Sequence, residues 1–175
     1  MLGLGLHWLS RHLERSTLAL VIILHTVANI VVAFYLGFFH QRGTISVIHD
    51  LAGAVSPGDQ VVFLTPCHAT PFHSHIHADN VTLRFLDCSP DIVTKQGGEH
   101  EEARFYKDAG SWWDGYSAAR LVQKFSSEYV VVFEGGDMHV LLKREGYVVE
   151  KRYFFAHLLL DQKLAHHIFL YKKTF

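Results

Sequence analysis

The chain has 175 residues, which suits one membrane span and one globular domain with a sizeable core. It carries 16 Lys and Arg against 17 Asp and Glu, so it has no net positive charge with which to hold the phosphates of a nucleic acid. This balance argues against nucleic-acid binding. Hydrophobic residues make up 49% of the chain, and their excess in the first forty positions predicts a domain boundary there.

Residues 17–39 contain no Lys, Arg, Asp or Glu. At about 1.5 Å per residue, this stretch is long enough to cross a hydrocarbon layer of about 30 Å as a helix, and we predict a transmembrane helix that is retained in the mature protein. His25 and Asn29 lie four residues apart, on one face of that helix. Two interpretations stay open: the two polar groups are tolerated in lipid, or they face another membrane helix.

The charges that flank the span predict its orientation. Arg11 and Arg15 precede it and Arg42 follows it, so the positive-inside rule favours a cytoplasmic N-terminus. We therefore expect residues 1–16 to be a cytoplasmic or interfacial segment and residues 44–175 to form a lumenal domain. Asn80 begins an Asn-Val-Thr sequon, a candidate glycosylation site on the same lumenal side.

The remaining residues predict an α/β domain. A helix is expected to start near Ile45 and to end at the turn sequence of residues 56–59. A helical region is expected over residues 99–124, interrupted around Asp114 and Gly115, and a short helix over residues 138–144. Strands are expected over residues 60–65, 81–87, 128–134, 147–155 and 168–172. Because helices alternate with strands, we expect a mainly parallel sheet with helices on both faces.

Histidines crowd the segment that follows the first predicted strand. If its last part is extended, His73, His75 and His77 point to the same side and could gather around Zn²⁺. The alternatives are a structured loop, or a loop that contacts a ligand without a metal, and we expect no metal and no other cofactor. The candidate ligand-contacting residues of this loop are His68, Thr70, His73, Ser74, His75 and His77.

Three other features carry weaker signals. Cys67 and Cys88 are the only cysteines, and both lie in the predicted lumenal domain, so a disulfide between them is an open candidate. They lack the CxxC spacing of a redox or zinc motif. Trp112 and Trp113 favour a place in the core over stacking on a sugar. Residues 134–137, Glu-Gly-Gly-Asp, lack a phosphate-loop pattern and favour a plain turn in which the Asp caps the next helix.

Several longer strings resemble a known family. The string VVFLTPCHATPFHSHIH at residues 61–77, with LRFLDCSPD at residues 83–91, is similar to the C-terminal lumenal region of the GPI mannosyltransferase III family, in glycosyltransferase family 22. EARFYKDAGSWW and EYVVVFEG fit the same region. The resemblance implies an enzyme of the endoplasmic reticulum membrane that transfers a third mannose, in α-1,2 linkage, from dolichol-phosphate-mannose to the GPI-anchor precursor.

The resemblance covers about half of the chain and does not include the acidic first lumenal loop that carries catalysis in such enzymes. We therefore assign no catalytic residue and expect a C-terminal portion that lacks the N-terminal transmembrane bundle and is inactive alone. One alternative is a single-pass protein with a lumenal binding or adaptor module, which a stop codon just upstream would favour. The other is a small histidine-based metalloenzyme, which elemental analysis would test.

Overall fold

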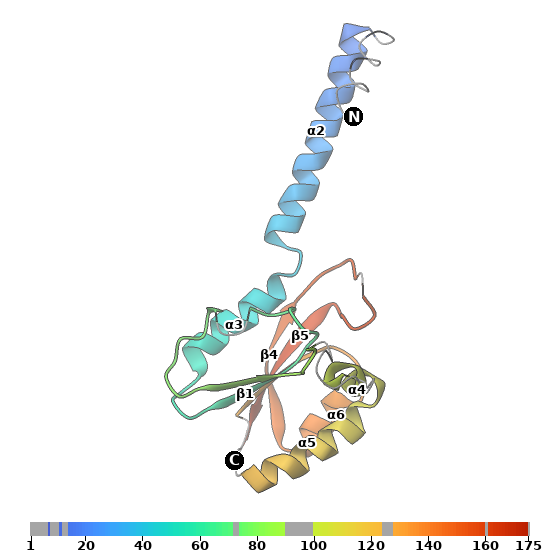
Figure 1. Ribbon diagram of the computed structural model, residues 1–175. Coiled ribbons are helices and arrows are strands. Elements are labelled where there is room, and N and C mark those ends of the chain that lie inside the picture. The colour runs from blue at the N-terminus through green and yellow to red at the C-terminus, as the bar shows by residue number, and fades with distance from the viewer. Residues whose placement is uncertain are drawn as a thin grey trace. The chain divides into compact units, whose positions relative to one another are not determined.

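The computed structural model describes residues 7 and 11 and residues 14–71, 74–89, 100–123, 128–159 and 161–174 (Figure 1). The chain divides into two compact units, Met1–His40 and Gln41–Phe175. Most of the predicted N-terminal segment, residues 1–16, lies outside the described residues.

The first unit contains α2, Arg15–Phe38. None of its residues is buried, and large apolar side chains cover it, including Leu24 and Ile30, which are 60% and 62% exposed. The described part of the chain has one helix that is long and apolar enough to cross a membrane. Asn29 donates a hydrogen bond to the backbone carbonyl of His25, one turn earlier, at 2.7 Å, so the helix itself offers this amide a partner.

The second unit is built on a five-stranded sheet in the order β2-β1-β3-β5-β4. The strands are β1 (Gln60–Leu64), β2 (Thr82–Phe85), β3 (Tyr129–Phe133), β4 (Tyr147–Phe154) and β5 (His167–Lys173). All five predicted strands are therefore confirmed, with bounds that shift by no more than two residues. β1 and β3 are buried along their whole length, as expected of central strands that are covered on both faces.

The prediction of a mainly parallel sheet was wrong, because the sheet is mixed. β1 runs parallel to β2 and to β3, whereas β5 is antiparallel to both β3 and β4. The described part of the connection between β4 and β5 has no helix to carry the chain back to the starting edge, so these two strands pair as an antiparallel hairpin. The apolar pattern of a strand does not record the direction of its neighbours.

Helices cover both faces of the sheet, as expected. α3 (Arg42–Ala54) packs on one face, where Val47, Ile48 and Leu51 share a core with Val61 and Phe63. The other face is covered by α4 (Glu101–Lys107), α5 (Ala109–Gln123) and α6 (Met138–Arg144). Helix α6 has the predicted bounds.

The predicted interruption at Asp114 and Gly115 was wrong, because both residues lie inside α5 and the break occurs at Asp108. The Asp108 carboxylate accepts hydrogen bonds from the backbone N–H of Ser111 at 2.9 Å and from its hydroxyl at 2.7 Å. Asp108 is therefore the N-cap of α5, which begins at the next residue, Ala109. In α5, Trp113 is completely buried, which confirms its expected place in the core.

Candidate functional site

A cavity of about 230 Å³ opens at the edge of the sheet where β1 and β3 end. Such an edge, at the carboxyl ends of parallel strands, is a common place for ligands in α/β sheets. Residues from β1, from α4 and the start of α5, from the end of β3 and the turn into α6, and from the connection between β4 and β5 line it. They are Leu64, Phe105, Tyr106, Ala109, Val132, Phe133, Glu134, Gly135, Gly136, Asp137, Met138, Gln162, Lys163 and Leu164.

Helix α4 supplies one wall of the cavity and is held to the end of β2 by Glu101. The Glu101 carboxylate accepts hydrogen bonds from Arg84 at 2.6 Å, from the backbone N–H of Asp87 at 2.9 Å and from the indole of Trp112 at 3.2 Å. Because this carboxylate joins β2 to both α4 and α5, it fixes the first turn of α4. The rings of Phe105 and Tyr106, later in the same helix, are thereby placed at the cavity.

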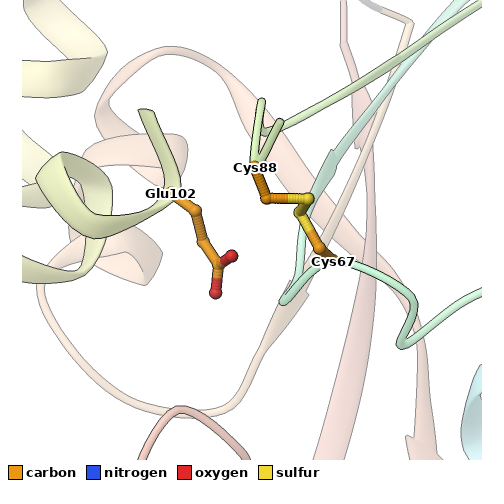
Figure 2. A group of neighbouring side chains, drawn as sticks. All are labelled: Cys67, Cys88 and Glu102. Carbon is orange, nitrogen blue, oxygen red and sulfur yellow. A yellow bond between two sulfur atoms is a disulfide. The ribbon is translucent and has the colours of Figure 1, made fainter. Parts of the chain in front are cut away.

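A disulfide between Cys67 and Cys88 lies beside α4. Figure 2 shows the Glu102 carboxylate lying next to the two sulfur atoms, and all three side chains have ligand atoms within 4.8 Å of one another. Disulfide sulfurs are not the thiolates that bind zinc. This group of residues therefore does not fit a metal centre in its oxidised form, and the disulfide joins the segment after β1 to the segment after β2.

Glu102 also pairs with Lys163 across the fold, and this pair leads to Tyr106. Lys163 Nζ lies 2.7 Å from Glu102 Oε1 and 5.4 Å from the centre of the Tyr106 ring. The hydroxyl oxygen of Tyr106 is buried and has no hydrogen-bond partner among the described residues. Burial raises the pKa of this phenol well above its usual value, with a further rise from the charge of Glu102, so Tyr106 stays protonated in the cavity wall.

The opposite wall is the turn between β3 and α6. Gly135 and Gly136 adopt positive φ angles of 114° and 69°, which glycine allows at little cost and which bring the bare backbone to the cavity. Asp137 occupies the N-cap position of α6, as expected, although its side chain makes no cap hydrogen bond and its carbonyl accepts from Val140 and Leu141. The turn predicted for residues 134–137 is thus confirmed, and it also forms part of the cavity wall.

Two histidines hydrogen-bond to this turn and hold its conformation. His167 Nδ1 lies 2.8 Å from the Glu134 carboxylate, and this hydrogen bond lowers the pKa of Glu134. His139 Nε2 accepts the backbone N–H of Gly135 at 3.1 Å, which leaves Nδ1 to donate to the Tyr171 hydroxyl at 2.6 Å. Burial lowers the pKa of His139, which is consistent with a neutral ring in this role. The acidic side of the cavity is therefore held in place by imidazoles.

The predicted histidine loop follows β1 at the same edge of the sheet, but none of its candidate residues that the structure describes lines the cavity. His68, Ser74, His75 and His77 are exposed, and His73 lies outside the described residues. Thr70 is buried, and its hydroxyl has no partner in the part of the chain that the structure describes. The segment around His75 and His77 is irregular, so the described part of it is not the extended strand that would point alternate side chains to one side.

Sequence reasoning missed Tyr106 and Lys163 as cavity residues. They stand 57 positions apart, so no spacing rule connects them, and the chain meets itself there only after the sheet has formed. The one local signal was the pair of glycines after β3. Acidic groups at Glu134 and Asp137, the ammonium group of Lys163 and an apolar floor that includes Leu64 and Phe105 together suit a ligand with hydroxyl groups on one side and C–H groups on the other.

Comparison with known proteins finds similarity to mannosyltransferases. Residues 2–77 match the Alg9-like mannosyltransferase family. The chain is 41% identical over 103 residues to GPI mannosyltransferase 3 of Drosophila melanogaster, covering 55% of this chain and 18% of that protein. It is 28% identical over 159 residues to GPI alpha-1,2-mannosyltransferase 3 of Mus musculus, covering 84% of this chain and 28% of that protein.

A fungal relative matches almost the whole chain. Over 195 residues, the chain is 26% identical to GPI mannosyltransferase 3 of Eremothecium gossypii, covering 95% of this chain and 33% of that protein. The chain thus spans at most about a third of the length of these curated relatives. No solved structure matches it.

Proposed function

We propose that the chain is the C-terminal part of an enzyme that builds the GPI anchor, because it is similar to the GPI mannosyltransferase 3 proteins. In this proposal the complete enzyme transfers the third mannose, in α-1,2 linkage, from dolichol-phosphate-mannose to the GPI precursor. The similarity to GPI mannosyltransferases along 84% of the chain in the mouse relative carries the proposal. The small share of each relative that is covered supports a role as one portion of a longer enzyme.

We propose that residues 17–39 span the membrane of the endoplasmic reticulum and that residues 44–175 lie in its lumen. The excess of basic residues before the span supports this orientation. Asn80 is exposed in the turn before β2, where a glycan could be attached without disturbing the core. In this arrangement His25 and Asn29 face other membrane helices of the complete enzyme.

The cavity is proposed to hold one mannose ring of the acceptor glycan. Its volume of about 230 Å³ lies below the roughly 300–1,000 Å³ of pockets for drug-sized ligands, so it suits a single sugar ring. Glu134 and Asp137 can accept hydrogen bonds from sugar hydroxyls, and the partly exposed ammonium group of Lys163 can donate one. We assign the cavity a binding role and leave catalysis to residues outside this chain.

Binding can be tested on the intact chain in lipid nanodiscs by saturation-transfer NMR. We expect signals from α-linked mannobiose, weaker signals from cellobiose as a disaccharide of equal size, and a loss of the mannobiose signal in Glu134→Gln and Asp137→Asn. The matched control is Asp114→Asn, an exposed position on α5 outside the cavity. Equal binding of the two sugars, or unchanged binding in both cavity variants, would remove the binding role.

The second test is a transfer assay with dolichol-phosphate-mannose and a GPI precursor that carries two mannoses. We expect no mannose transfer by the 175-residue chain alone, and transfer when the complete reading frame is expressed. Transfer by the isolated chain would overturn the assignment of catalysis to another part of the enzyme. A complete reading frame that fails to transfer mannose would overturn the family-based activity.

A further inference from the structure

The start of the second unit is tied to the end of β4. The backbone N–H of Gln41 donates a hydrogen bond to the carbonyl of Phe155 at 2.8 Å. Two residues later, Gly43 approaches the backbone of Phe154 so closely that a Cβ atom there would lie 2.7 Å from the carbonyl oxygen. The first residues after the candidate span and the end of β4 are therefore one tightly packed junction.

An apolar surface extends from this junction. Phe154, Leu158 and Leu159 are 36%, 66% and 36% exposed, and His157 packs its ring against Phe154 at 4.5 Å between ring centres. Figure 1 shows the connection between β4 and β5 extending past the end of the sheet at which α3 begins. We call Phe154, His157, Leu158 and Leu159 the loop patch. Its side chains are the kind that enter the boundary between lipid headgroups and acyl chains.

The position of the patch along the chain places it near the membrane. Helix α2 ends at Phe38 with Phe39 as its cap, and Gln41 follows two residues later. Two residues reach at most about 7 Å, so Gln41, and with it the hydrogen-bonded Phe155, stays close to the point where the span leaves the lipid. This restriction follows from chain length and from the Gln41–Phe155 bond, whatever the tilt of the span.

We propose that the loop patch inserts into the leaflet from which the span emerges and makes a second membrane contact of the lumenal domain. This inference rests on the proposed membrane span. Arg42 is exposed in the same junction and can meet the lipid phosphates while the leucines enter the apolar layer. The patch is thus continuous with the membrane anchor, which favours lipid over a separate protein partner as its occupant.

The contact also orients the cavity. Gln162, Lys163 and Leu164, in the second half of the same connection, line the cavity, and the first half carries the loop patch. A domain held at this connection presents its cavity edge to the membrane surface. That is where the sugar headgroup of a lipid-linked acceptor would lie.

The inference can be tested by attaching a polarity-sensitive fluorophore at single cysteines of the full chain in phosphatidylcholine vesicles. Both native cysteines are bonded to each other, so an added thiol is labelled selectively. The variants are Leu158→Cys in the patch, Ile30→Cys in the span and Val148→Cys as the control. Val148 is exposed on the same strand, β4, about 20 Å from Phe154 at six residues' distance.

We expect doxyl-labelled lipids to quench the fluorophore at Leu158→Cys and Ile30→Cys by roughly two-fold or more and to leave Val148→Cys unaffected. Quenching at Leu158→Cys should be stronger when the doxyl group is near the headgroup than when it is deep in the acyl chain. Quenching at Ile30→Cys alone would overturn the loop contact and leave the span in place. Absence of quenching at all three positions would overturn the span as well.

Discussion

The hydrogen bond from the Gln41 N–H to the Phe155 carbonyl, 2.8 Å long, joins the first residue of the sheet domain to the end of its edge strand. Helix α3 and strand β4 meet at this point.

Gly43→Ala should destabilise the domain. The added methyl would lie 2.7 Å from the Phe154 carbonyl oxygen, a backbone atom that cannot move aside easily, so we expect a loss of about 1–3 kcal/mol in the free energy of unfolding. Gly53→Ala is a matched control in the same helix, because nothing lies within 4 Å of its added methyl. There, alanine should stabilise by roughly 0.5–1 kcal/mol. Urea unfolding in detergent micelles measures both, and equal effects would contradict the close approach.

Replacing both disulfide cysteines, Cys67→Ser with Cys88→Ser, should cost about 3 kcal/mol of stability, because the bond closes a loop between residues 21 positions apart. The segments after β1 and β2 also lose their covalent link, so mannobiose binding at this edge of the sheet should weaken. Reduced wild-type chain serves as the control and should unfold at the same urea concentration as the double variant. If the double variant is as stable as the oxidised wild type, the disulfide does not hold this edge of the domain.

Lys163→Met should cost more than Glu102→Gln. The Glu102 side chain is only 13% exposed, so removal of Lys163 leaves a nearly buried carboxylate without its partner, at a cost of about 1–3 kcal/mol. Glu102→Gln removes the negative charge that Lys163 compensates, so it should lower the free energy of unfolding by less. A double-mutant cycle from urea unfolding should give a coupling of about 1 kcal/mol between the two side chains. Strictly additive losses would show that the 2.7 Å pair does not join α4 to the β4–β5 connection.

The Asp50 carboxylate should make the domain sensitive to acid. Hydrogen bonds from Lys151, at 2.5 Å, and from Tyr153, at 2.7 Å, lower the pKa of Asp50 in the folded chain. The folded pKa lies below the unfolded one, so the contribution of Asp50 is complete above the unfolded value of about 4 and is lost as the pH falls through the folded value. Below about pH 4, the free energy of unfolding should therefore fall more steeply with decreasing pH in wild type than in Asp50→Asn.

Lys151→Met removes the largest cause of this shift and should flatten the acid dependence in the same direction. The comparison is made between slopes, since Asp108 and Glu134 also have lowered pKa values and contribute to the acid dependence of every variant. Identical slopes for wild type and Asp50→Asn would show that protonation of Asp50 does not change the stability of the domain.

Much of the fold could be predicted from local patterns. The uncharged run of residues 17–39 predicted α2, and the β-branched runs at residues 60–65 and 128–134 predicted β1 and β3, because burial on both faces selects such residues in central strands. The bounds of α6 and the buried Trp113 were also predictable. The break at Asp108 was missed because a helix start depends on a side-chain cap. The Asp-x-x-Ser pattern at residues 108–111 supplies this cap, whereas the Asp-Gly pair at residues 114–115 lies inside α5.

The sequence by itself determined which segments are helices and strands, which of their faces are apolar, and which family the chain resembles. Only the tertiary structure decided the mixed directions of the strands, the Cys67–Cys88 bond and the cavity that gathers Tyr106, Asp137 and Lys163. The physical reason is that periodicity records whether a side chain meets water or core, whereas contacts between distant segments depend on which strands pair, and pairing leaves no periodic trace along the chain.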